Sequence, residues 1–257
     1  MTVLAHLSDL HLDGGAESAD RVRRVVEYLT ALPGTVDAVL ITGDIADHGT
    51  EAEYHQAREL LAPLHDRHPV LLCPGNHDSR PQFREVLLGL PAGPAPVDEV
   101  HDIGGVRILM CDSSVPGRPE GALEPQTLRW LDDTLAAAPD RPTFVAFHHP
   151  PTPLGLPYID GIALREPTAL AKALERHDQV LAVLCGHAHT AATTAFAGRP
   201  LLCAPGIAST ALLPWEQGPE DSWKTHEAPL ALTFHLYEEG DAEGDAEGRV
   251  TSHVRAL

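Results

Sequence analysis

An amide and an imidazole stand side by side in one turn of the sequence, and together they could do chemistry. Asn76 and His77 follow Pro74 and Gly75, which end a short apolar run at residues 70–72. A turn after a strand presents polar side chains to a cleft and not to a core. An amide oxygen can bind a metal ion, and an imidazole can transfer a proton. We therefore interpret this turn as the floor of an active site.

Two further clusters have the spacing of chelating pairs. Asp9 and His11 follow an apolar run at residues 3–8, and in an extended chain alternate side chains point to the same side. His187 and His189 follow another apolar run at residues 180–184, and two imidazoles at this spacing have few uses other than metal binding. Both pairs are therefore candidate metal ligands.

Single candidates follow two other apolar runs. Asp44 comes directly after the run at residues 37–42 and one glycine, and His148 and His149 come directly after the run at residues 143–147. Adjacent residues point in opposite directions if the chain stays extended, so only one of the two histidines is predicted to be a ligand. We choose His148. Asp78 after His77 either orients that imidazole or completes the turn, and we favour the turn.

These strand ends offer more donors than one tetrahedral ion uses, which predicts two ions. The set mixes carboxylate, amide and imidazole groups without a thiolate, so we expect manganese or iron, with zinc and cobalt as alternatives. Two ions about 3.5–4 Å apart need a bridging ligand, and a carboxylate can supply it. The predicted ligands are Asp9, His11, Asp44, Asn76, His148, His187 and His189.

Strands and helices must alternate to bring these donors together. Residues 17–32 have the apolar periodicity of a helix, and Thr50 with Glu53 forms a capping box for a helix that continues through residue 61. Strand, helix, strand, helix and strand then follow one another up to Asn76. This order predicts parallel βαβ units, whose ligands lie at the carboxyl ends of the strands.

The second half of the chain is predicted to be richer in strands. A hairpin is expected at residues 100–110, and Gly-Asp-Ala-Glu repeats at residues 240–248 are expected to form a solvated turn between the last two strands. Helices are expected at 82–88, from 124 and at 169–177, and strands at 143–147, 180–184, 193–196, 200–203, 230–237 and 250–254.

Composition restricts the classes of partner. The 257 residues have a net charge of -19, which disfavours long nucleic acids, although bound cations would still allow a small anionic substrate. No apolar run approaches the roughly 18 residues of a membrane span, so we expect no membrane partner and a cytoplasmic location. Cys73, Cys111, Cys185 and Cys203 form no paired motif and are expected to be reduced and buried.

The order Asp-x-His, Gly-Asp, Gly-Asn-His-Asp, His and Gly-His-x-His resembles the calcineurin-like metallophosphoesterase superfamily. The resemblance implies a four-layer α/β/β/α sandwich with two mixed β-sheets flanked by helices. It also implies that a hydroxide between the two metals attacks phosphorus and that His77 assists the leaving group without binding metal. The implied ligands are Asp9, His11 and His189 for the first metal, Asn76, His148 and His187 for the second, and Asp44 for both.

Within that superfamily, the opening at residues 6–11 and the run at 148–155 resemble bacterial class III cyclic nucleotide phosphodiesterases and the related glycerophosphodiesterase. The implied activity is hydrolysis of small phosphodiesters, with 3',5'-cyclic AMP first and glycerophosphodiesters or a broad phosphodiesterase and phosphomonoesterase activity as alternatives. A nuclease or a non-catalytic scaffold is less favoured. Members of that branch often oligomerise, so a homodimer is implied as well.

Two long connections remain without an assigned role. Residues 150–165 and 205–228 either cover the cleft or contact a second subunit, and Tyr158 in the first of them is a candidate substrate-binding residue, together with Asn76 and His77. We expect a single domain over residues 1–257. Its motif-bearing core spans residues 3–204, and a loop and β-hairpin at 205–257 are expected to complete the second sheet.

Overall fold

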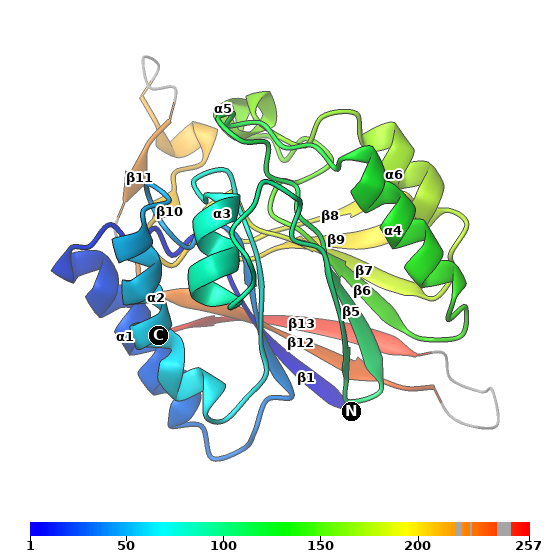
Figure 1. Cartoon of the computed structure of the whole chain (residues 1–257), viewed down its shortest axis with the longest axis horizontal. Helices are drawn as coiled ribbons and strands as arrows, with labels where there is room; N and C mark the ends of the chain where they lie inside the picture. The colour runs from blue at the N-terminus through cyan, green and yellow to red at the C-terminus, as the bar shows by residue number, and fades with distance from the viewer. Residues whose placement is uncertain (219–222, 227, 241–247) are drawn as a thin grey trace.

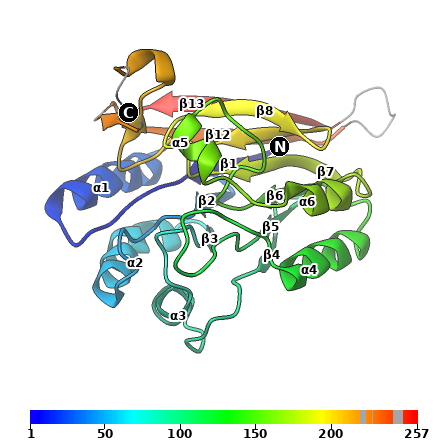
Figure 2. The same cartoon turned by 90° about the horizontal axis from the view of Figure 1, so that it is seen from above.

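A computed structural model describes residues 1–218, 223–226, 228–240 and 248–257. Most of the Gly-Asp-Ala-Glu repeat lies outside these described residues. Figures 1 and 2 show two β-sheets that face one another, with helices on the outer face of each. This is the expected four-layer α/β/β/α arrangement, and both sheets mix parallel and antiparallel pairs.

The first sheet contains the predicted βαβ units. Strands β1 (Thr2–Leu7), β2 (Ala38–Thr42) and β3 (Val70–Cys73) are parallel and are joined by helices α1 (Ala16–Thr30) and α2 (Glu51–His65). The capping box of Thr50 and Glu53 is present at the start of α2, as predicted. The carboxyl ends of three strands that carry candidate residues therefore lie at one edge of the sheet.

The C-terminal hairpin lies in the first sheet, so the expectation that it completes the second sheet is wrong. Strands β12 (Ala231–Glu238) and β13 (Arg249–Ala256) are antiparallel, and β12 pairs with β1, which gives the order β13-β12-β1-β2-β3. The hydrophobic pattern of the hairpin specified two strands but not the sheet edge that they join. Pairing with β1 covers the free edge of a strand whose side chains are buried on both faces.

The second sheet has the order β4-β5-β6-β7-β9-β8. Helices α4 (Pro125–Ala136) and α6 (Pro167–Leu174) cover its outer face (Figure 1). The strands are β4 (Glu99–Ile103), β5 (Val106–Met110), β6 (Thr143–Ala146), β7 (Val180–Cys185), β8 (Ala192–Phe196) and β9 (Arg199–Cys203). β4 and β5 form the predicted hairpin.

Three apolar clusters fill the spaces between the four layers. Strand β2 shows how this arises, because successive side chains of a strand point to opposite faces. Val39 and Ile41 pack in the cluster with α1 and α2, whereas Ala38 and Leu40 pack in the cluster between the two sheets. A third cluster joins the second sheet to α4 and α6. Each sheet is thus buried on both faces, which explains the nearly continuous apolar runs of its central strands.

The shorter elements lie mainly in the connections. The helix expected at residues 82–88 is one turn of α-helix, α3 (Arg80–Gln82), followed by the π-helix η1 (Phe83–Leu87). The connection at residues 150–165 contains α5 (Pro157–Gly161). The connection at 205–228 contains the two-stranded ribbon of β10 (Thr210–Ala211) and β11 (Thr225–His226), with the 3-10 helix η2 (Pro214–Glu216) between them.

The cysteines are free and buried, as expected. Burial raises the pKa of the Cys73 and Cys111 thiols well above the usual range, which makes them poor nucleophiles. Within the described residues, no helix has both the length and the apolar character needed to cross a membrane.

A pair of buried imidazoles makes the stability of the fold sensitive to acid. His6 Nδ1 lies 3.0 Å from His235 Nε2, and the other nitrogens of the two rings lie against the hydroxyls of Thr42 and Ser252. Burial lowers the pKa of His235 to about 3 and holds that of His6 well below its usual range. Both rings are therefore neutral in the folded protein at pH values where they are protonated in the unfolded chain.

We expect the free energy of unfolding to fall as the pH falls from about 6.5 towards 3, because the unfolded chain takes up protons that the folded protein excludes. Each such histidine contributes about 1.4 kcal/mol per pH unit in this window. Urea denaturation at several pH values measures the slope. His235→Gln should reduce the slope by about one proton relative to wild type, whereas the exposed His253→Gln should leave it unchanged. Equal slopes in wild type and His235→Gln would contradict the prediction.

Candidate metal centre

The backbone turns sharply where the candidate ligands follow the strands. Seven described residues other than glycine have a positive φ, and five of them are predicted ligands: Asp9 (55°), His11 (42°), Asp44 (50°), His187 (68°) and His189 (50°). This left-handed conformation is sterically unfavourable for most residues and accumulates at functional sites. The extended geometry predicted for the Asp9 and His11 pair is therefore wrong, since β1 ends at Leu7 and the turn itself directs the side chains.

One group of donors gathers around the end of β1. His11 Nε2 lies 3.0 Å from His189 Nε2, and the carboxylate oxygens of Asp9 and Asp44 lie 3.5 Å from His189 Nε2 and 3.6 Å from His11 Nε2, respectively. Ligand atoms that share an ion at about 2.0–2.2 Å lie roughly 3–3.5 Å from one another. The spacing in this group fits one metal ion.

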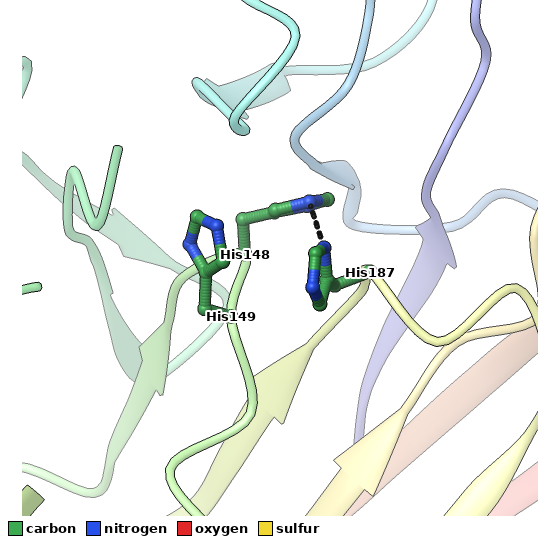
Figure 3. A group of neighbouring side chains, drawn as sticks. All are labelled: His148, His149 and His187. Atoms are coloured by element: carbon green, nitrogen blue, oxygen red, sulfur yellow. Dashed lines mark hydrogen bonds between the residues drawn. The ribbon is translucent and has the colours of Figure 1, made fainter. Parts of the chain in front are cut away.

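A second group lies beside the first. His148 Nε2 is 3.1 Å from Asn76 Oδ1, 3.0 Å from His187 Nδ1 and 3.2 Å from Asp44 Oδ2. Figure 3 shows the rings of His148 and His187 pointing towards one another from the ends of β6 and β7. The Asp44 carboxylate therefore contacts both groups, and all seven predicted ligand residues converge on one centre.

In His148 and His11, the ring nitrogen that faces away from the centre already has a partner. His148 Nδ1 lies 2.8 Å from the Thr42 carbonyl oxygen, and His11 Nδ1 lies 2.8 Å from Asp47 Oδ1. Because carbonyl and carboxylate oxygens only accept, each Nδ1 carries the hydrogen and each Nε2 presents a lone pair to the centre. Lone pairs of several nitrogens and oxygens at about 3 Å repel unless a cation lies among them. The chemistry of this donor set therefore fits bound metal cations.

The pKa shifts of the residues at the centre also agree with bound metal cations. Burial alone would raise the pKa of Asp44, but the protonated imidazoles of His148 and His11 outweigh it and hold that pKa well below its usual range. Burial alone would lower the pKa of His148, but the Asp44 carboxylate in turn raises that pKa to about 9. The centre thus favours positive charge beside Asp44, and bound metal cations would supply it in place of these protons. Burial, reinforced by the neighbouring imidazoles of His149 and His148, keeps the pKa of His187 well below its usual range. An ionised carboxylate and a neutral imidazole are the forms that bind metals.

His149 takes no part in the two groups. Its ring lies 4.8 Å from that of His148 and 4.7 Å from that of His187 between centroids, beside both rings in Figure 3, but its two nitrogens have other partners. Its Nδ1 lies 2.8 Å from Ser113 Oγ, and its Nε2 lies 3.2 Å from the Pro119 carbonyl oxygen. The structure thus places His148, which we had chosen, beside Asp44 and leaves His149 in a structural role.

His77 lies at the edge of the centre with its side chain partly exposed. Its backbone N–H donates to Asp44 Oδ1 (2.9 Å), and its Nδ1 lies 2.7 Å from the Asp47 carbonyl oxygen. The ring meets that of His11 edge-on at 4.6 Å between centroids. Its Nδ1 therefore carries the hydrogen, and its Nε2 is available to a substrate.

Asp78 completes the turn, as we favoured. Its carboxylate accepts hydrogen bonds from the backbone N–H groups of Gly75 (2.8 Å), Ile45 and Ala46 and from the hydroxyl of Tyr54. Burial, with the nearby charge of Asp44, raises its pKa to about 6. Asp78 therefore fastens the turn of Asn76 and His77 to the loop that carries Asp44.

Three functional positions escaped the sequence interpretation. Asp47 orients His11 through Nδ1, Ser209 Oγ lies 2.9 Å from His189 Nδ1, and Gly75 leaves room for Asp44. A Cβ on Gly75 would lie 2.2 Å from Asp44 Oδ1, so any larger residue would displace that carboxylate. The spacing of Asp47, three residues after Asp44, is a signal that could have identified it.

A cavity of about 440 Å³ opens over the centre. This volume lies in the range of small-molecule sites, about 300–1,000 Å³. His11, Asp44, Asn76, His77 and His189 line it, and so does Tyr158 from the connection at 150–165. None of the described residues that line it is Lys or Arg, so metal cations would provide the positive charge for an anionic substrate.

The chain is similar to known proteins in sequence and in fold. The chain is 37% identical over 223 residues to a probable cyclic nucleotide phosphodiesterase of Rhodococcus erythropolis, with 84% of this chain and 74% of the relative covered. It is also 37% identical over 209 residues to a glycerophosphodiester phosphodiesterase of Enterobacter lignolyticus, with 76% and 73% covered. A dimetal phosphatase from Danio rerio superposes over 97% of this chain and 98% of its own, with a TM-score of 0.67 at 16% identity.

The model of the calcineurin-like phosphoesterase family matches residues 2–191, a span that contains all seven residues of the centre and His77. Calcineurin-like phosphoesterases use a dinuclear metal site, and the Asp and His groups described above agree with one. The chain therefore belongs to the calcineurin-like phosphoesterase family.

Proposed function

We propose that the chain hydrolyses small phosphodiesters at a centre of two transition-metal ions, with 3',5'-cyclic AMP as the leading substrate. The observation that carries the proposal is the position of Asp44, whose Oδ2 lies 3.6 Å from His11 Nε2 and 3.2 Å from His148 Nε2. A single carboxylate that contacts two groups of donors is suited to bridge two ions.

Each group has its own set of ligands in this proposal. Asp9, His11 and His189 would hold one ion, and Asn76, His148 and His187 would hold the other. Manganese and iron suit this mixture of oxygen and nitrogen donors best, with zinc and cobalt as alternatives. The chemistry that ions held by these residues would supply is activation of a water molecule as the nucleophile for attack on phosphorus.

The chain's own residues would then orient the ester and assist the leaving group. The Nδ1–H of His77 is held by the Asp47 carbonyl oxygen, which leaves Nε2 facing the substrate side. A protonated Nε2 can donate its proton to the departing oxygen, which would otherwise leave as an alkoxide. Asn76 would bind metal at the same edge of the cavity through Oδ1, and its neighbour His77 would then lie beside the bound ester.

The electrostatics of the cavity favour small phosphodiesters over polynucleotides. A polynucleotide needs a basic track for its further phosphates, and none of the described lining residues is Lys or Arg. The relatives named above are a cyclic nucleotide phosphodiesterase and a glycerophosphodiester phosphodiesterase, and this keeps glycerophosphodiesters as the second candidate substrate class. A scaffold would not need seven converging ligands. The cytoplasmic location, the homodimer and the single domain stay predictions.

A substrate panel tests the activity. With manganese present, we expect faster hydrolysis of bis(p-nitrophenyl) phosphate than of p-nitrophenyl phosphate, because a diester carries one charge fewer into a cavity without Lys or Arg. Cyclic AMP and glycerophosphodiesters complete the panel. Asn76→Ala should stay folded, since it removes a partly exposed ligand and no core contact, and should lose most of the activity. A preference for the monoester would reject the diesterase proposal.

A further inference from the structure

One wall of the cavity is apolar and aromatic and has no role in holding metal. It is formed by Pro119, Tyr158, Ile159, Ile162, Ala208 and Trp223. A phosphate bound at the metal centre would direct one of its esterified groups past this wall. This wall would therefore select among the groups that can be esterified to the phosphate. Because the wall carries no charge, it suits an uncharged group.

Two aromatic rings from different connections meet on this wall. The rings of Tyr158, on α5, and Trp223, just before β11, lie 5.2 Å apart at an angle of 32°. Trp223 also meets the ring of the metal-ligand candidate His189 edge-on, with 6.0 Å between centroids and an angle of 89°. The pair is thus adjacent to the metal centre. Figure 1 shows α5 and the β10–β11 ribbon at the same end of the molecule.

The aromatic pair is held by its own small core. Leu156, Ile159 and Ala188 are buried, and Leu154, Ile162, Leu213 and Trp223 pack against them; we call this set the mouth cluster. It joins the connection at 150–165 to the one at 205–228.

Hydrogen bonds hold both connections in place around the pair. The Asp160 carboxylate accepts from the backbone N–H groups of Leu154 (2.7 Å) and Gly155 (3.1 Å), and the Ala211 N–H donates to the His189 carbonyl oxygen (3.1 Å). These hydrogen bonds, together with the pairing of β10 with β11, fix the backbone of the two connections that carry the rings.

We infer that Tyr158 and Trp223 form a stacking platform for a planar ring in the group esterified to the phosphate, such as a nucleobase. This inference rests on the proposed phosphodiesterase function. The two rings are inclined at 32°, so the outer face of either ring stays available as a flat surface for stacking, which suits a base. A quaternary ammonium group such as choline is instead held by rings that surround it from several sides. The platform thus favours cyclic nucleotides over glycerophosphodiesters.

Kinetics of the manganese-loaded protein test the platform. Trp223→Leu keeps an apolar side chain in the mouth cluster but removes the flat ring. Loss of one base–aromatic stack lowers affinity by about 5- to 150-fold. We therefore expect Trp223→Leu to lose about 10-fold more kcat/KM on cyclic AMP than on glycerophosphoglycerol, mainly through KM, and Trp223→Phe to restore most of it. Trp215→Leu is the matched control, because Trp215 is 79% exposed and is not among the described lining residues.

Equal losses on both substrates would overturn the platform in favour of a structural role beside His189. A loss confined to glycerophosphocholine would overturn it in favour of a cation site. An unchanged cyclic AMP profile would also overturn it.

Binding measurements separate this inference from the proposed function. Calorimetry with adenosine 5'-monophosphate and with ribose 5-phosphate gives the contribution of the base. Wild type should bind the nucleotide about 5- to 150-fold more tightly than the sugar phosphate, and Trp223→Leu should lose most of this ratio. If wild type cleaves no diester but shows the ratio, the phosphodiesterase proposal fails and the platform stands. If the ratio is the same in both proteins, the platform fails whatever the enzyme cleaves.

Discussion

Asp44→Asn is expected to retain fewer than two metal ions per chain and to lose at least about 10²- to 10³-fold in kcat/KM on a diester. The substitution keeps the shape of the side chain and removes its charge. Asp44 is the residue that contacts both His11 and His148, so its carboxylate cannot be replaced by another ligand of either group. An amide oxygen has too little charge to bridge two cations.

Elemental analysis of the purified variant measures the metal content, and turnover of bis(p-nitrophenyl) phosphate measures the activity. Asp102→Asn is the control, since that carboxylate is half exposed and pairs with Arg107 on the surface. It should bind metal and turn over like wild type. An Asp44→Asn protein with two ions and full turnover would mean that the two groups do not share a bridging ligand.

His77→Ala is expected to keep its metal content but to lose about 10²- to 10⁴-fold in kcat on cyclic AMP, the range of general acid catalysis. His77 is not one of the predicted ligands, and its side chain is 41% exposed, so its removal should not unfold the protein. The loss should be smaller on bis(p-nitrophenyl) phosphate, because p-nitrophenolate leaves without being protonated.

The comparison of the two substrates distinguishes proton donation from general disturbance of the site. His48→Ala is the matched control, because His48 is a nearby exposed imidazole that pairs with Glu53 and is not among the described residues that line the cavity. We expect it to change neither substrate by more than about 2-fold. Equal losses on cyclic AMP and the aryl diester after His77→Ala would contradict a role in protonating the leaving group.

Much of the fold followed from local patterns. The capping box of Thr50, the apolar face of α1 and the runs of β1, β2 and β3 are determined by neighbours in the chain, and the structure contains all of them. The sheet edge chosen by the C-terminal hairpin was not predictable in this way. It depends on pairing between β1 and β12, which lie more than 220 residues apart in the chain.

In the candidate site, too, some features follow from neighbours in the chain and others depend on distant residues. The predicted donors were found because they follow apolar runs, although the physical reason given for the Asp9 and His11 pair was wrong. Their convergence depends on left-handed turns, which leave little trace in residue type beyond a preference for Asp, Asn and His. Asp47 and Trp223 were not assigned, since their roles come from partners in other loops, His11 in one case and Tyr158 in the other.

The pairing of β1 with β12 has a consequence for biosynthesis. The ribosome makes β1 more than 220 residues before β12, so one edge of β1 has no partner strand while that length of chain is translated. Exposed strand edges recruit other chains, and nascent polypeptides of this protein should therefore need chaperone protection until β12 has been released. Asp9 and His11 follow that same strand, so we expect the metal centre to reach its native geometry only after β12 has been translated and has paired with β1.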